Sequence, residues 1–226
     1  MKLSSETLEI LTGISRLNAK SPINGAVFKK GNVIKARRYK STMPVMYATI
    51  EEEFPKDFAV FDLPRFIAMF NMMGNPEITF DDTNILLKAG RKRAKLRYIS
   101  EHLIEPDENF FARTIKMPSV DFSFDLDKDT LKSVMDATSM FQAPQISISG
   151  DGENVVLTTY NVKDPKADKL EIEIGESDWE FNIILDMENL HFLRRDYTIS
   201  LSKKGILEWK SGDLTYYITC SDKSKV

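Results

Sequence analysis

The chain has few of the residues that most often carry chemistry. Its 226 residues include a single cysteine, Cys220, and two histidines, His102 and His191. One cysteine cannot form a disulfide within the chain, which is typical of a protein from a reducing compartment. Neither histidine has a partner at the spacing of a zinc site, so a surface or satisfied histidine is the better interpretation of both.

Long apolar runs and an excess of positive charge are absent too. No stretch of about eighteen apolar residues occurs, which excludes a transmembrane helix, and residues 1–4 lack the apolar segment of a secretory signal. The net charge of −3 excludes a generally basic nucleic-acid binder, so any DNA contact must use a local group of cations. With 42% hydrophobic residues, the chain can form one large domain or two of about a hundred residues.

The sequence shows no convincing catalytic pattern. It has no glycine-rich phosphate loop and no Ser/His/Asp grouping in a usable context. Four acids follow calcium-loop spacing: Asp125, Asp127, Asp129 and Asp136. Thr130, however, stands where that loop requires glycine, and acids at a helix N-terminus are the simpler interpretation. We therefore expect a protein without enzyme activity, metal or cofactor, and keep a hydrolase that uses the Asp125–Asp129 carboxylates as a weaker alternative.

A repeated strand-to-helix unit organises the chain. In residues 58–70 (FAVFDLPRFIAMF) an alternating strand ends at Asp62 and turns through Leu63-Pro64 into a helix. The same order returns in residues 122–135 and 181–193, and residues 4–17 supply another helix, capped by Ser4 or Ser5. The four helices begin about sixty residues apart, which indicates internal duplication.

Short strands between turn residues fill the rest of both halves. Residues 100–118 interrupt this rhythm with two prolines and a run of acids, and form the best linker candidate. The sequence thus predicts an α+β fold of two similar domains, residues 1–108 and 109–226. Each is expected to be an antiparallel sheet with helices on one face.

This plan, with the opening residues MKLS, resembles the sliding clamps of T4-type bacteriophages. Residues 170–220 are also similar to the second half of proliferating cell nuclear antigen, in the strands LEIEIGE and WEFNIILD and the paired tyrosines of LTYYITC. The resemblance implies the DNA clamp fold and a closed ring that encircles duplex DNA and tethers the replicative DNA polymerase. It also implies a clamp-loader ATPase as partner, docking of other replication or transcription proteins, and action in the cytoplasm of an infected bacterium.

Helix packing favours a particular number of chains in such a ring. Helices about 10 Å apart make a circle of about 25 Å for eight helices, which leaves about 15 Å inside, less than the width of a duplex. Twelve helices leave about 28 Å. With four helices per chain, we expect a homotrimer. The alternative function is a non-DNA protein-interaction module that duplication merely enlarged.

The resemblance implies three kinds of site. Positive side chains are expected to face the DNA, with ordinary solvated helix faces as the alternative: Arg16, Lys20, Arg65, Lys132, Arg194 and Arg195. A groove for partner peptides is expected from Met43, Val45, Leu103, Ile104, Met117 and Pro118. Nearby acids, such as Glu6, Glu9 and Asp136, dilute the positive lining.

Two strands of opposite charge are expected to join neighbouring chains. The basic strand contributes Lys92, Arg93, Lys95, Leu96, Arg97 and Tyr98, and the acidic strand contributes Glu171, Ile172, Glu173 and Ile174. In clamps of this type the corresponding strands meet across the subunit boundary, which predicts antiparallel pairing of the two. The alternatives are that both are solvated edges, or that the basic strand binds phosphate.

Overall fold

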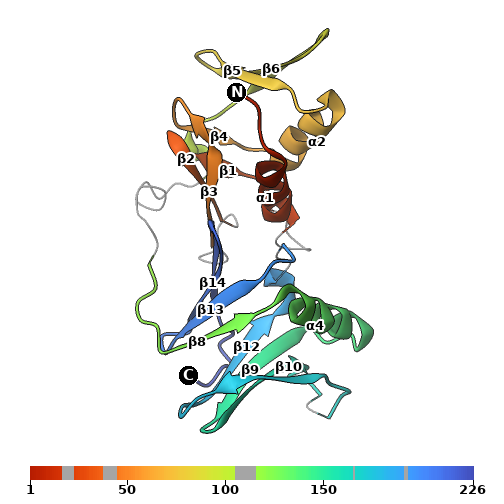
Figure 1. Cartoon of the computed structure of the whole chain (residues 1–226), viewed down its shortest axis with the longest axis vertical. Coiled ribbons are helices and arrows are strands. Elements are labelled where there is room, and N and C mark those ends of the chain that lie inside the picture. The colour runs from red at the N-terminus through yellow and green to blue at the C-terminus, as the bar shows by residue number, and fades with distance from the viewer. Residues whose placement is uncertain (17–22, 38–44, 105–115, 165, 191–192) are drawn as a thin grey trace. The chain divides into compact units, whose positions relative to one another are not determined.

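The computed structural model describes residues 1–16, 23–37, 45–104, 116–164, 166–190 and 193–226. By its contacts the chain forms two compact units, Met1–Ile115 and Lys116–Val226 (Figure 1). Within the described residues, none of the helices combines the length and apolar character that a membrane span requires.

The first unit packs two helices beside antiparallel strands. Helix α1 (Ser5–Arg16) contacts both α2 (Leu63–Met73) and β3 (Val45–Phe54) (Figure 1). Strand β3 continues the order β4-β1-β2-β3, with β1 at Ala26–Phe28, β2 at Gly31–Arg37 and β4 at Phe58–Val60. A second sheet has the order β5-β6-β7, with β5 at Glu77–Phe80, β6 at Asn84–Ala89 and β7 at Lys92–Arg97. A 3-10 turn, η1 (Glu101–Leu103), follows.

The second unit repeats this plan with two sheets and the helix α4 (Lys128–Met140), which contacts β10. One sheet has the order β15-β14-β13-β8, with β8 at Phe122–Leu126, β13 at Tyr197–Ser202, β14 at Ile206–Ser211 and β15 at Leu214–Thr219. The other has the order β11-β10-β9-β12, with β9 at Gln145–Asp151, β10 at Asn154–Tyr160, β11 at Glu171–Glu176 and β12 at Glu180–Asp186. The pairings within both are antiparallel.

Aromatic rings fill much of the core of each unit. Phe28 stacks on Phe58 with ring centroids 4.6 Å apart, and Phe66 of α2 lies 6.1 Å from Phe28. In the second unit the buried rings of Tyr197 and Trp209 meet edge to face, with ring centroids 5.9 Å apart.

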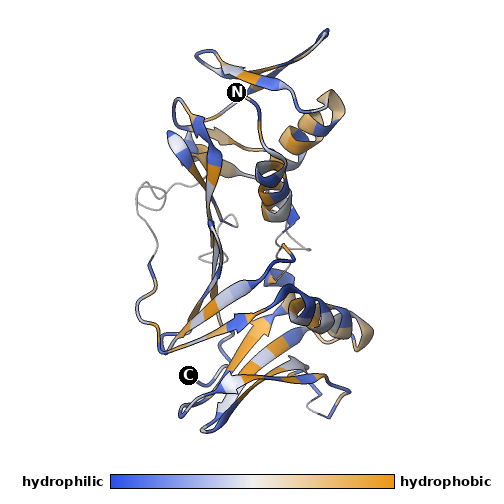
Figure 2. Cartoon of the chain, in the orientation of Figure 1, coloured by the Kyte–Doolittle hydropathy of each residue, from blue (hydrophilic) through white to orange (hydrophobic). Residues whose placement is uncertain are grey.

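Figure 2 shows that α2 is mainly hydrophobic, whereas hydrophilic residues run along α4. The polar side of α4 is therefore its solvent side.

Side-chain caps explain where the helices begin. Ser4 caps α1, since its Oγ accepts a hydrogen bond from the amide of Thr7 at 3.1 Å. Asp62 caps α2 by accepting from the amide of Arg65 at 2.9 Å, and Pro64 occupies the first turn. Asp127 caps α4 by accepting from the amides of Asp129 and Thr130, both at 2.9 Å. These bonds satisfy amides that have no partner within the helix.

The helix expected after Asp186 is a correction to the sequence-based prediction. Only a three-residue 3-10 turn, η2 (Met187–Asn189), begins there among the described residues. Asp186 makes no cap, and its Oδ1 instead accepts a hydrogen bond from Nε2 of Gln145 at 2.9 Å. A carboxylate engaged with a neighbouring strand does not stabilise a first helical turn as Asp62 and Asp127 do.

Candidate interaction sites

The basic strand lies where the sequence placed it. Strand β7 stands at the outer position of the order β5-β6-β7, and its charged and apolar residues alternate. Lys95 and Arg97 are exposed, whereas Ala94 and Leu96 are half-buried. Successive side chains of a strand point to opposite faces, so β7 has one charged face and one apolar face.

Asp81 supports this strand from the turn between β5 and β6. Its Oδ1 accepts hydrogen bonds from the amides of Thr83 at 2.8 Å and Asn84 at 2.6 Å, and Nζ of Lys95 lies 3.5 Å from its Oδ2. The bond from the Thr83 amide, followed by that from the Asn84 side chain, lowers the pKa of Asp81 to about 2. The turn therefore presents a carboxylate beside Lys95.

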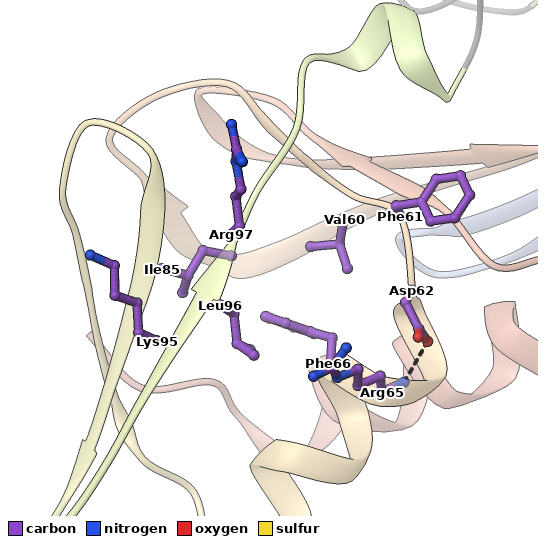
Figure 3. A pocket seen from close by; sticks show the side chains of 9 residues that line it. All are labelled: Val60, Phe61, Asp62, Arg65, Phe66, Ile85, Lys95, Leu96 and Arg97. Atoms are coloured by element: carbon purple, nitrogen blue, oxygen red, sulfur yellow. Dashed lines mark hydrogen bonds between the residues drawn. The ribbon is translucent and has the colours of Figure 1, made fainter.

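A recess of about 300 Å³ opens beside β7 (Figure 3). We call it the β7 recess, and its lining residues are Val60, Phe61, Asp62, Arg65, Phe66, Ile85, Lys95, Leu96 and Arg97. Leu96 and Phe66 extend toward one another across it (Figure 3). Arg65, Lys95 and Arg97 therefore add positive charge beside a partly apolar floor.

Arg65 and Phe61 acquire their positions from the start of α2. The cap at Asp62 begins the helix there, which places Arg65 in the first turn and at the recess. Phe61 precedes the cap and is 64% exposed. The sequence analysis expected Arg65 to face DNA and assigned Phe61 to no site. Phe61 could have been noticed as an aromatic residue directly before a helix cap, outside the apolar face of the helix.

The acidic strand is also at the outer position of its sheet, in the order β11-β10-β9-β12. Glu171 and Glu173 are exposed, and Ile172 and Ile174 are half-buried. A β-bulge interrupts the pairing with β10, because Val155 is opposite Gly175 whereas the next residue, Val156, is opposite Glu173. Ile174 is the extra residue of this bulge.

The residues expected to face DNA are placed unevenly. Lys20 lies outside the described residues, and Arg16 is exposed at the end of α1. Lys132 lies on the solvent side of α4 with its Nζ 2.5 Å from Oδ2 of Asp136. Hydrogen bonding to Lys132, with a smaller contribution from the charge of Arg194, holds the pKa of Asp136 below its ordinary value. Lys132 and Arg194 thus both favour the charged form of one carboxylate. Arg195 is half-buried.

The residues expected to form the peptide groove differ in accessibility. Ile104 is 7% exposed and packs against Val27 and Ala59 in the core of its own unit. Val45 is also buried, whereas Leu103 is 65% exposed. Met117 is half-buried and Pro118 exposed, both in the second unit, and Met43 lies outside the described residues.

An ionic cluster holds the η1 turn in place beside Ile104. Nζ of Lys29 lies 2.5 Å from Oδ2 of Asp57 and 3.0 Å from Oε2 of Glu101. Burial alone raises the pKa of Asp57, but hydrogen bonds from Lys29 and the Lys30 amide outweigh this effect, so that the pKa lies below its ordinary value.

Among the described residues, no three His, Cys, Asp or Glu side chains are grouped to hold a metal ion.

Comparison with known proteins identifies the architecture. The chain is 25% identical over 225 residues to a sliding clamp of Vibrio phage KVP40, which covers 96% of this chain and 98% of that protein. The chain is thus similar to a phage sliding clamp along nearly its whole length, and its fold is that of the sliding clamps. No protein-family profile matches it.

Solved structures agree with this assignment of the fold. The chain superposes on the DNA polymerase III beta subunit of Borrelia burgdorferi with a TM-score of 0.71 at 11% sequence identity. It superposes on the beta subunit of Streptococcus pneumoniae with a TM-score of 0.66 at 16% sequence identity. Each covers 99% of this chain, and the chain spans 64% of their length. The DNA polymerase sliding clamp of Pseudomonas aeruginosa gives a TM-score of 0.65 at 13% identity, over 96% of this chain and 62% of its own. The predicted clamp fold and the resemblance are confirmed.

Proposed function

We propose that the chain is a non-enzymatic sliding clamp that encircles duplex DNA and tethers a replicative DNA polymerase as a processivity factor. The observation that carries this proposal is the similarity to a phage sliding clamp along 98% of that protein's length. By the same reasoning it acts in the cytoplasm of the infected bacterium. A clamp-loader ATPase places it on DNA, and other replication or transcription proteins also dock on it.

The two oppositely charged edge strands support a head-to-tail ring, which we propose is a homotrimer. A ring of identical chains needs a heterologous interface, in which one surface meets a different surface of the next copy. The outer positions of β7 and β11 in their sheets suit them to this role. Each exposed ion pair contributes only about 0.2–1 kcal/mol, so the charges select the partner more than they determine affinity.

The sparse positive charge supports sliding. A protein that moves along DNA must avoid base-specific contacts and rely on attraction to phosphates, which carries no sequence information. Arg16, Lys132 and Arg194 are exposed cations on or near helices, and Asp136 moderates two of them. Such a surface holds DNA weakly and without a fixed register.

Retention on circular DNA tests the proposal. The protein is loaded on nicked circular DNA, separated from free protein, and assayed before and after a single linearising cut. A topological ring stays on the circle and leaves after the cut, whereas a protein held by direct contacts stays on both. Equal retention, or a monomeric mass in solution, would contradict the proposal and favour an interaction module without a DNA role.

A further inference from the structure

The β7 recess defines what can occupy it. Its floor is apolar, with Phe66, Val60 and Ile85 buried and Leu96 half-buried. Its rim carries the exposed cations Arg65, Lys95 and Arg97 (Figure 3). An occupant that complements both parts must bring an apolar side chain flanked by carboxylates.

Strand β11 has this composition. Ile172 is half-buried between the exposed carboxylates of Glu171 and Glu173. In one chain β7 and β11 belong to different sheets, β5-β6-β7 and β11-β10-β9-β12. Charge complementarity, with continuity to the ring interface already proposed, points to β11 of a second copy as the occupant.

The bulge in β11 limits how the two strands can align. An alignment with Leu96 opposite Ile174 would use the extra residue of the bulge, where the hydrogen-bond ladder between strands is locally disrupted. It would also set Gly175 opposite Lys95, which removes one of the two charge pairs. An alignment with Leu96 opposite Ile172 uses the regularly paired residues before the bulge. Residues directly opposite each other in an antiparallel pair lie on the same face of the sheet, so Leu96 and Ile172 would then be neighbours.

We infer that β7 of one copy and β11 of the next pair antiparallel with Leu96 opposite Ile172, Arg97 opposite Glu171 and Lys95 opposite Glu173. This inference rests on the proposed ring and specifies its register. Ile172 then fills the β7 recess beside Leu96, and the carboxylates meet the cations. Arg65 belongs to this subunit contact and not to the DNA-facing surface to which sequence reasoning assigned it.

Engineered cysteines test the register directly. The only native cysteine, Cys220, is first replaced by serine. Into this background go either Leu96→Cys with Ile172→Cys or, as a matched control, Leu96→Cys with Ile174→Cys. Opposite residues lie about 4.5–5.5 Å apart between Cα atoms, within disulfide range, whereas residues two positions off lie about 7–8 Å apart. Under mild oxidation we expect the first pair to give at least about tenfold more covalent trimer in denaturing gels.

The outcomes separate the register from the ring. A trimer by mass in solution, in which the Ile174 pair cross-links as well or better, overturns the register and leaves the proposed function standing. A protein that is monomeric before oxidation overturns the ring, and the inference with it. A trimer that neither pair cross-links places the contact elsewhere on the surface and overturns the inference alone.

Charge exchange supplies a second measurement without cysteines. Arg97→Glu weakens the trimer, and we expect Glu171→Lys to restore it while Glu173→Lys restores much less. For Lys95→Glu the order reverses, with Glu173→Lys the better rescue. Equal rescue by both lysine substitutions would contradict a fixed register. An intact trimer on Arg65→Glu, with weaker retention on circular DNA, would contradict the assignment of Arg65 to the contact.

Discussion

Lys132 and Asp136 face each other one turn apart on α4, with Nζ of the lysine 2.5 Å from Oδ2 of the aspartate. The pair lies on the solvent side of the helix, with Arg194 close enough to influence the same carboxylate. A cation held this way is less available to a phosphate. In the proposed ring, the relationship connects the local charge pattern of the helix to how tightly DNA is held.

Removing Asp136 should strengthen and steepen DNA binding. Asp136→Asn frees Lys132 and Arg194, and each additional phosphate contact should increase the slope of log affinity against log salt by about 0.9. The measurement is binding to short duplex DNA between low and moderate salt. Asp213→Asn, in the exposed β14–β15 turn, makes the same change in net charge as a control. Equal effects of both would show that only net charge matters.

Reversing the charge of β7 should open the ring. Lys95→Glu with Arg97→Glu places like charges opposite β11 of the next copy, so we expect monomers by light scattering. Adding Glu171→Lys with Glu173→Lys should restore part of the trimer, and the wild-type ring should weaken as salt rises. An unchanged mass after the first pair of substitutions would show that β7 is not the interface. Its phosphate-binding interpretation would then be the one to test.

Leu103 and Ile104 should respond differently to truncation although they are neighbours. Ile104 packs on Val27 and Ala59, so Ile104→Ala should lower the free energy of unfolding by about 2–4 kcal/mol. Leu103 is 65% exposed, so Leu103→Ser should leave stability within about 0.5 kcal/mol. Chemical denaturation measures both.

Only the Leu103 variant is therefore a clean probe of the partner groove. If the groove includes this residue, Leu103→Ser should weaken the binding of a polymerase tail peptide while the ring stays intact. Unchanged affinity would remove Leu103 from the groove. A stable Ile104→Ala protein would contradict the core position of that side chain.

Protonation of Asp81 should destabilise the first unit in acid. The pKa of Asp81 in the folded protein is about 2, below its ordinary value of 3.8. A group with a lowered pKa contributes its full stabilisation above the unfolded value, and this contribution is lost as pH falls through the folded value. Asp81→Asn should thus be less stable than wild type at neutral pH, with the difference shrinking between about pH 4 and pH 2. Asp82→Asn, at the exposed neighbouring position, serves as the control. A deficit that does not change with pH would contradict the prediction.

Local sequence patterns were sufficient for most of the elements, and the resemblance to phage sliding clamps supplied the clamp fold. Alternating residues predicted β7 and β11, and the strand-to-helix turns at Asp62 and Asp127 predicted the starts of α2 and α4, because these signals depend only on residues within a few positions. The same rule failed at Asp186. Its carboxylate is within reach of Gln145, forty-one residues away, and that bond is visible only in the folded chain.

Tertiary structure also decided which side chains remain available at the candidate sites. Leu103 and Ile104 read alike in sequence, but only the fold brings Val27 and Ala59 against the second of them. By sequence, Arg65 is a solvated cation at the start of a helix. In the fold, β7, which lies about thirty residues further along the chain, is next to Arg65, and both line the recess. Charge and alternation are properties of the sequence, whereas exposure and neighbourhood depend on contacts between distant segments. The sequence therefore determined the kind of protein, and the fold determined which residues do its work.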